Sequence, residues 1–240
     1  MSKFIPIQNY SSNLFANYKF NETTGSTCID SKGAYNGTYT GTTSVTENGL
    51  TFRRFNGSSD YIQINNPILK GSKLSILLRI RTTQTSIGYV LDNCLSWYTG
   101  YMVKIYQGKL KIEYYTDAGV YGAFVESNIV SDGQWHTVLF TMEQKTIDGV
   151  LTTYLNAYTD DLSTPNETVS SIRNVVTIPS YNLSIGRPTG MSNYYFNGDL
   201  DDIEIYNEVV KYKDIENNDR NTLKVGEVIK GEYKSTGNYL

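Results

Sequence analysis

YYFNGDLDDIEIYN, residues 194–207, is the stretch that decides the fold expected for this chain. Its Asn197-Gly198 dipeptide favours positive φ angles and predicts a turn. The residues that follow alternate between acidic and apolar, which predicts a strand whose isoleucines share one face. Strict alternation places Asp201 on that same apolar face. Because an unpaired carboxylate is costly in apolar surroundings, we expect Asp201 to have a partner.

Working outward, the same alternation recurs along the chain between turn signals. Residues 73–81 place four apolar side chains on one face and two arginines on the other. The dipeptides Gln107-Gly108, Asp148-Gly149 and Asn56-Gly57 each separate two such runs and predict hairpins. We expect about a dozen short strands, a spacing typical of an all-β sandwich or barrel with antiparallel sheets. Residues 209–215 keep a helical period and predict one short C-terminal helix at most.

Composition and charge exclude several classes of protein. The 240 residues fit one large all-β domain, and the 21 tyrosines suit half-buried sheet surfaces. A net charge of −3 gives no electrostatic footprint for nucleic acid. No apolar run approaches the roughly 18 residues that predict membrane insertion. Cys28 and Cys94 are compatible with two free, half-buried thiols or with one disulfide.

Four groups of segments follow one another along the chain in an order known from one protein family. They are residues 18–25 with 30–33 and 36–38, residues 55–62, residues 131–138, and residues 185–186 with 196–207. In these segments the chain resembles the laminin-G-like/concanavalin-A-like jelly rolls, in particular their pentraxin-like subgroup. The resemblance implies an antiparallel two-sheet jelly-roll sandwich over residues 1–215. Residues 216–240 are then a tail that serves as a strand, a linker or an oligomerisation arm.

The resemblance also implies a structural calcium ion between the N-terminal loop and the last strand. Carried over to this sequence, its ligands would be Asp30, Asn36, Asp201 and Asp202. Calcium binds six to eight oxygens from carboxylates, carbonyls and water. The alternative is that Asp201 accepts backbone N–H groups from that loop, because a buried carboxylate requires only some hydrogen-bond partner.

Aromatic side chains in the middle of the chain are the candidate ligand contacts. They are Trp97, Tyr98, Tyr101, Tyr115 and Tyr121. Exposed aromatic rings can stack on a sugar ring while neighbouring polar groups bind its hydroxyls. The alternative is that these tyrosines pack against neighbouring strands, as cross-strand aromatic pairs commonly do.

Catalytic constellations are weak in this sequence, and we expect no enzyme activity. His136 is the only histidine, it follows Trp135 in what reads as a core strand, and no Gly-x-Ser-x-Gly motif accompanies it. Asp202 and Glu204 share a predicted face, as catalytic carboxylates do in jelly-roll glucanases. Their order differs from the glucanase signature, however.

We therefore expect a non-enzymatic binding module that recognises a cell-surface glycan or protein. The alternatives are a purely structural domain that stabilises an assembly, and a glycoside hydrolase of jelly-roll type. The first residues lack an apolar h-region, so no cleaved secretory signal is expected. A module of extracellular type without such a signal is expected in a virion or phage particle, as a tail-fibre, baseplate or decoration protein released by lysis, and otherwise in the cytoplasm. Its further partners would be other virion proteins or, through the tail, copies of itself.

Overall fold

The computed structural model of this chain describes residues 4–65, 72–94, 100–116, 120–173 and 182–214. Regular structure in these residues is entirely β, as predicted. None of the described segments forms a helix that could span a membrane. The strands are β1 (Phe4–Pro6), β2 (Leu14–Tyr18), β3 (Thr27–Cys28), β4 (Gly37–Thr40), β5 (Thr43–Glu47), β6 (Leu50–Asn56), β7 (Tyr61–Ile64), β8 (Lys73–Arg81), β9 (Gly88–Asp92), β10 (Gly100–Tyr106), β11 (Lys109–Tyr115), β12 (Tyr121–Ile129), β13 (Trp135–Ile147), β14 (Val150–Thr159), β15 (Glu167–Ser171), β16 (Leu183–Ile185), β17 (Asn197–Tyr206) and β18 (Tyr212–Asp214).

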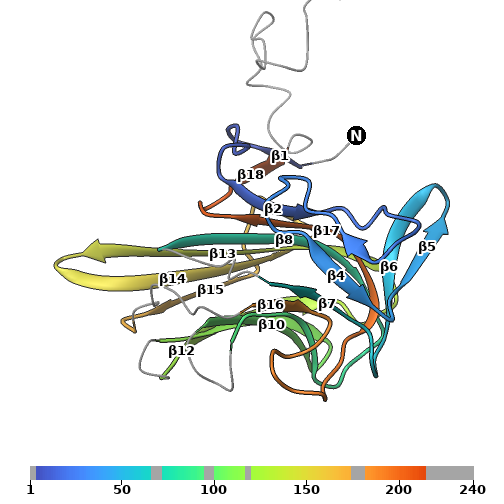
Figure 1. Ribbon diagram of the computed structural model, residues 1–240. Helices are drawn as coiled ribbons and strands as arrows, with labels where there is room; N and C mark the ends of the chain where they lie inside the picture. The colour runs from blue at the N-terminus through green and yellow to red at the C-terminus, as the bar shows by residue number, and fades with distance from the viewer. Residues whose placement is uncertain (1–3, 66–71, 95–99, 117–119, 174–181, 215–240) are drawn as a thin grey trace, which may run out of the picture.

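Two antiparallel sheets form the two layers of a sandwich (Figure 1). Sheet 1 has the strand order β12-β11-β10-β9-β16-β7-β4-β3. Sheet 2 has the order β15-β14-β13-β8-β17-β6-β5, and β2 pairs with the far end of β17. This architecture confirms the predicted two-sheet sandwich of jelly-roll type.

Alternation along the strands builds the core between the sheets. The apolar residues at even positions of β8 are all buried, and Arg79 and Arg81 project from its other face. Strand β13 pairs with β8 in register, so that Phe140 lies opposite Ile76 in the same core. Each such side chain contributes roughly 1.5–3 kcal/mol when it leaves water. Because one face of each central strand is buried in this core, only its other face can carry a binding site.

Two of the three predicted hairpins are confirmed, and the third is wrong. Gln107-Gly108 joins β10 to β11 and Asp148-Gly149 joins β13 to β14, with positive φ at all four residues. Asn56-Gly57 instead leads from β6 in sheet 2 to β7 in sheet 1. The Asn56 side chain accepts N–H bonds from residues 58–60, which holds a crossing loop in place of a two-residue turn.

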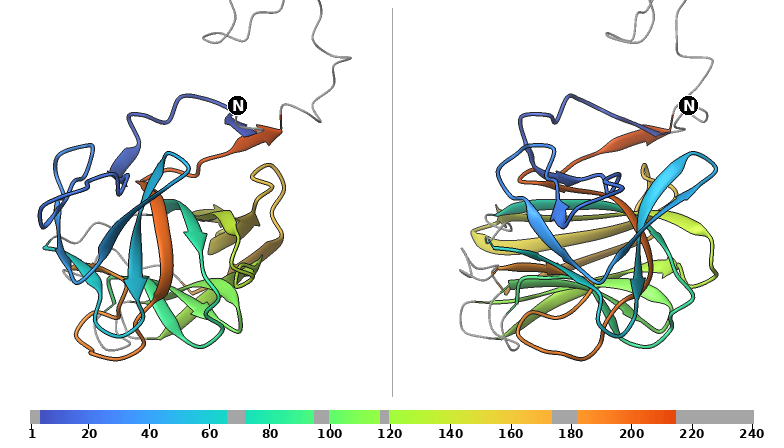
Figure 2. Two further views of the ribbon diagram at one scale, coloured as in Figure 1. Left: turned by 90° about the vertical axis from the view of Figure 1, so that its right-hand side faces the viewer. Right: turned by 45° about the vertical axis from the view of Figure 1, so that its right-hand side comes forward.

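The two ends of the described chain meet outside the sandwich. Strand β1 pairs with β18, and this two-stranded ribbon lies beyond sheet 2, as the views in Figure 2 show. The predicted helix at residues 209–215 is wrong, because residues 212–214 find a strand partner in β1. The tail at residues 216–240 lies outside the described residues, so its role stays a prediction.

Candidate functional site

The outer face of sheet 1 carries the aromatic residues that the sequence singled out. On β11 the even positions, such as Ile112, enter the core, and the odd positions, such as Glu113 and Tyr115, face outward. Tyr121 on β12 pairs directly with Tyr115, after a register shift that follows Tyr114. Tyr115 and Tyr121, which belong to two different strands, thus become cross-strand neighbours on one surface.

Around this pair lies a row of rings that we call the tyrosine face: Tyr115, Tyr121, Phe124 and Tyr106, together with Lys111. The Tyr115 and Tyr121 rings meet edge to face at 5.6 Å, and Phe124 follows at 6.3 Å from Tyr121. The Lys111 ammonium lies 3.7 Å from the Phe124 ring centroid and 5.4 Å from that of Tyr106. All four rings remain partly exposed. The tyrosine face is therefore an aromatic platform that water still reaches.

A buried ion pair lies beside the rings on the same face. Lys104 Nζ is 2.6 Å from Glu113 Oε1, and Lys111 Nζ is 3.2 Å from Glu113 Oε2. The Glu113 side chain is only 3 % exposed. Because both carboxylate oxygens are held by ammonium groups, their direction is fixed. Fixed polar groups next to an aromatic wall are the usual composition of a small-ligand site.

The loop between β16 and β17 covers the central part of this face. Asp92 accepts N–H bonds from Thr189 at 2.5 Å and from Cys94 at 3.0 Å, and the Tyr194 ring lies 6.3 Å from that of Tyr89. Burial raises the pKa of Asp92 to about 7, although both N–H bonds act to lower it. Among the segments that the structure describes, none covers the edge formed by β11 and β12 in this way.

The predicted aromatic residues have three different outcomes. Tyr115 and Tyr121 lie together on the tyrosine face. Tyr101 points inward, is 2 % exposed and packs 6.5 Å from the Tyr114 ring, so its burial excludes contact with a ligand at the surface. Trp97 and Tyr98 lie outside the described residues.

Sequence reasoning missed Tyr106, Phe124 and Lys111. Phe124 and Lys111 have the parity of outward residues once Tyr115 is opposite Tyr121, and Lys111 pairs with Glu126, two residues beyond Phe124. Alternation within β12 alone could have shown that Phe124 points away from the core that Ala123 and Val125 enter. The register shift between the strands could not be read from the sequence.

The predicted position of Asp201 is wrong. Asp202 has φ of 46°, and the pairing of β17 with β8 shifts register between Asp201 and Glu204. This bulge lets Leu200 and Ile203 both enter the core and turns Asp201 to the outer face. There Asp201 Oδ2 accepts a 2.8 Å bond from Arg79 Nη1. Burial is the main cause that raises the pKa of Asp201 to about 6, and the neighbouring Asp202 charge raises it further, while Arg79 acts to lower it.

The Asp30 carboxylate is a backbone clasp. Its Oδ1 accepts N–H bonds from Asn17 at 2.9 Å and Lys32 at 3.0 Å, and its Oδ2 accepts bonds at 3.1 Å from Ala34 and Tyr35. Four donors therefore occupy the oxygens that a cation would need. The clasp ties the loop after β3 to β2, which in turn pairs with β17.

The residues carried over for calcium do not fit such a site. The Asn36 side-chain oxygen accepts the Asp30 N–H at 2.9 Å, and Asp201 is paired with Arg79. Among the described residues, no group of three or more acidic, histidine or cysteine side chains is placed to hold a metal ion. Cys28 and Cys94 are both buried and are not joined in a disulfide, which decides between the two alternatives for the cysteines.

Several solved structures share this fold. One is the binding domain of Paraclostridial Mosquitocidal Protein 1, with a TM-score of 0.63 and 14 % identity over 84 % of this chain and 50 % of that one. The binding domain of botulinum neurotoxin serotype D gives 0.60 and 11 % over 82 % and 49 %. Domain 4 of AbnA, an extracellular arabinanase from Geobacillus stearothermophilus solved with arabinotriose, gives 0.58 and 16 % over 83 % and 94 %.

The chain thus spans about half the length of the two toxin structures and nearly all of the arabinanase domain. No curated protein sequence is similar enough to count as a match. The sequence profile of the Laminin_G_3 family, described as the concanavalin A-like lectin/glucanases superfamily, matches residues 56–216, more than half of the chain. On this match and the two-sheet sandwich, the chain belongs to the concanavalin A-like lectin/glucanase superfamily.

Proposed function

We propose that this protein is a non-enzymatic binding module that recognises a glycan through the tyrosine face. The observation that carries the proposal is the row of partly exposed rings from Tyr115 through Tyr121 to Phe124, next to the fixed Glu113 carboxylate. Aromatic rings would stack on the apolar face of a sugar ring, and the Lys111 ammonium would donate to its hydroxyls.

Related structures support a binding role. The two toxin structures are described as binding domains, and the arabinanase domain was solved in complex with arabinotriose. These similarities extend to this chain only as a fold that serves binding in other proteins. They are the reason to prefer a glycan over an unspecified surface protein as the first ligand to test.

Three of the four carboxylates on β17 are engaged in structural contacts, which supports a role without catalysis. Asp199 and Asp201 are engaged by arginines, and Glu204 accepts bonds from the Tyr206 hydroxyl and the Asn17 amide. A glycosidase needs one carboxylate free as a base or nucleophile and a second one as the acid. These three carboxylates are all committed to structural bonds.

A glycan array, followed by calorimetry on the best ligand, tests the proposal. We expect Tyr121→Ala and Tyr115→Ala to weaken binding by at least about tenfold, the effect of losing one well-packed aromatic contact. The matched control is Tyr154→Ala, because Tyr154 is a partly exposed tyrosine of sheet 2 with its own lysine contact at 4.6 Å. A blank array, or equal binding by both tyrosine-face variants and wild type, would reject recognition and favour a purely structural domain.

The biological setting of the module stays a prediction. A role as a virion or phage-tail component is tested by mass spectrometry of purified particles from the producing cells. Detection of the chain at a fixed stoichiometry would support that role, and its absence from particles would refute it.

A further inference from the structure

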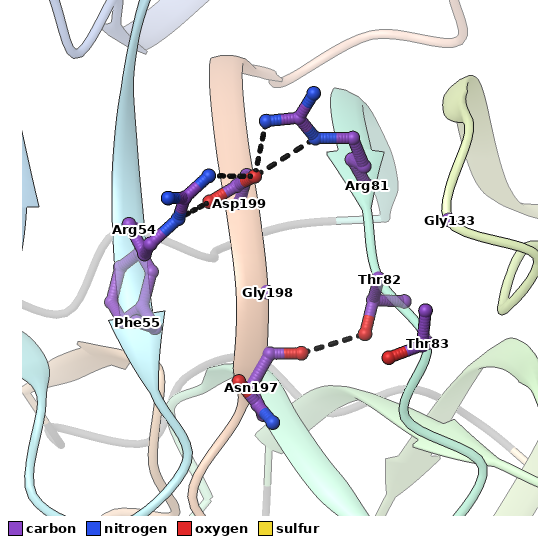
Figure 3. A pocket seen from close by; sticks show the side chains of 9 residues that line it. All are labelled: Arg54, Phe55, Arg81, Thr82, Thr83, Gly133, Asn197, Gly198 and Asp199. Carbon is purple, nitrogen blue, oxygen red and sulfur yellow. Dashed lines mark hydrogen bonds and ion pairs between the residues drawn. The ribbon is translucent and has the colours of Figure 1, made fainter. Parts of the chain in front are cut away.

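A pocket of about 270 Å³ opens on sheet 2, the sheet opposite the tyrosine face (Figure 3). It lies where β6, β17 and β8 run side by side, close to the turn before β13. Its lining residues are Arg54, Phe55, Arg81, Thr82, Thr83, Gly133, Asn197, Gly198 and Asp199. None of them belongs to the tyrosine face.

Strand register builds one wall of the pocket. Asp199 on β17 lies opposite Arg54 on one side and Arg81 on the other, and Arg81 in turn lies opposite Trp135. Figure 3 shows both guanidinium groups converging on Asp199. Arg54 donates to its two oxygens at 2.8 and 3.1 Å, and Arg81 donates twice to Oδ2 at 2.9 and 2.6 Å.

This wall is rigid and balanced in charge. The Arg81 guanidinium packs 5.0 Å from the Trp135 ring centroid and 4.9 Å from that of Phe52, and it donates to Glu47 at 2.9 Å. Two arginines therefore face two carboxylates, so the wall offers little net attraction to an anion. Charge-assisted bonds of this geometry hold the groups in place before any ligand arrives.

The other end of the pocket keeps its hydrogen-bonding capacity free. Thr83 and Asn197 are exposed, and their side chains make no hydrogen bond to any residue that the structure describes. A hydroxyl and an amide can each both donate and accept. The Arg54 side chain, 47 % exposed, adds donors on the opposite side.

We propose that this pocket binds one neutral sugar unit, as a second ligand site separate from the tyrosine face. A sugar hydroxyl both donates and accepts, which matches the pairing of guanidinium donors with the Thr83 hydroxyl and Asn197 amide. The volume lies just below the roughly 300–1,000 Å³ of most small-ligand sites, so it suits one ring and not an extended chain. Two sites on opposite sheets would let one molecule hold two glycans or two parts of one glycan.

Saturation-transfer NMR on the full chain tests this site with single neutral sugars: D-glucose, D-galactose, N-acetyl-D-glucosamine and L-arabinose. We expect transfer to at least one of them, weakened about tenfold by Asn197→Ala and by Thr83→Val, since each variant removes one or more hydrogen bonds. The matched controls are Asn193→Ala and Thr85→Val, which change exposed residues outside the pocket lining and should leave transfer unchanged.

Further arms separate this site from the proposed function and from anion binding. Tyr121→Ala should keep full transfer from the pocket ligand, even if it abolishes binding on the glycan array. No transfer from any neutral sugar, equal transfer in Asn197→Ala, or loss of transfer in Tyr121→Ala would each overturn the pocket site. Stronger binding of D-glucuronate than of D-glucose would overturn its assignment to neutral sugars.

Discussion

His136 shows at the residue scale how one side chain can link two turns. Its Nδ1 lies 2.8 Å from an Asp160 oxygen and its Nε2 lies 3.0 Å from an Asp132 oxygen. Partial burial alone would lower the pKa of His136, but hydrogen bonds to Asp160 and Asp132 outweigh it and raise the pKa above its ordinary value. When both ring nitrogens carry a proton, His136 can donate to both carboxylates and clamp the two turns together.

This clamp predicts a pH-dependent stability. A raised folded-state pKa means that the stabilisation is complete below the ordinary pKa of about 6.5 and is lost as pH rises through the folded value. His136→Gln should therefore lower the melting temperature more at about pH 5.5 than at about pH 8.5. Thermal melts of both proteins across this range provide the measurement. A deficit that stays constant or grows with pH would contradict the clamp.

At the element scale, strand β17 shows where the local sequence pattern and the tertiary structure disagree. The Asn197-Gly198 turn predicted from the sequence is wrong, because both residues already pair with Asn56 and Phe55 of β6. Gly198 has φ of 153° and passes so close to β8 that an added Cβ would lie 2.6 Å from the Arg81 carbonyl oxygen. The glycine therefore permits close strand approach and brings Asp199 between its two arginines.

Gly198→Ala should consequently destabilise the fold by about 2–4 kcal/mol, through backbone strain and a clash with main-chain atoms that cannot move aside. The matched control is Gly49→Ala, whose φ is 81° but whose Cβ would meet nothing within 4 Å. That variant carries the conformational cost alone, about 1–2 kcal/mol. Urea unfolding of both variants measures the difference. Equal losses in the two would show that close packing at Gly198 is unimportant.

At the scale of the whole molecule, contacts within the protein join the first loop to the last long strand. The Asp30 clasp fixes that loop on β2, β2 pairs with β17, and Asp201 is neutralised by Arg79. Backbone N–H groups thus satisfy the Asp30 carboxylate and an ion pair satisfies that of Asp201, two of the carboxylates for which calcium was predicted.

Calcium removal should therefore leave stability unchanged. We expect the same melting temperature in EDTA and in millimolar CaCl2, because a ligand stabilises a protein only when it binds the folded state. Asp30→Ala, by contrast, should lower the melting temperature in both buffers, since four backbone N–H groups lose their acceptor. A clear rise with calcium that Asp30→Ala abolishes would restore the calcium site.

The sequence by itself determined the all-β class, the inward and outward faces of β8, and the hairpins at Gln107-Gly108 and Asp148-Gly149. These features follow from alternation and turn chemistry, which act between near neighbours in the chain. Only the tertiary structure decided that Asn56-Gly57 crosses between sheets and that the bulge at Asp202 turns Asp201 outward.

The same division holds for the candidate sites. Tyr115 and Tyr121 were recognisable as candidates because aromatic residues cluster in this part of the sequence. Their pairing, however, required the shifted register of β11 and β12. The arginine–aspartate pocket joins residues 54, 81, 133 and 199, and no local pattern links them. Alternation along a strand specifies which side chains face the core, but it does not specify which strand pairs with it. Sheet membership and register are set by long-range packing and hydrogen bonding.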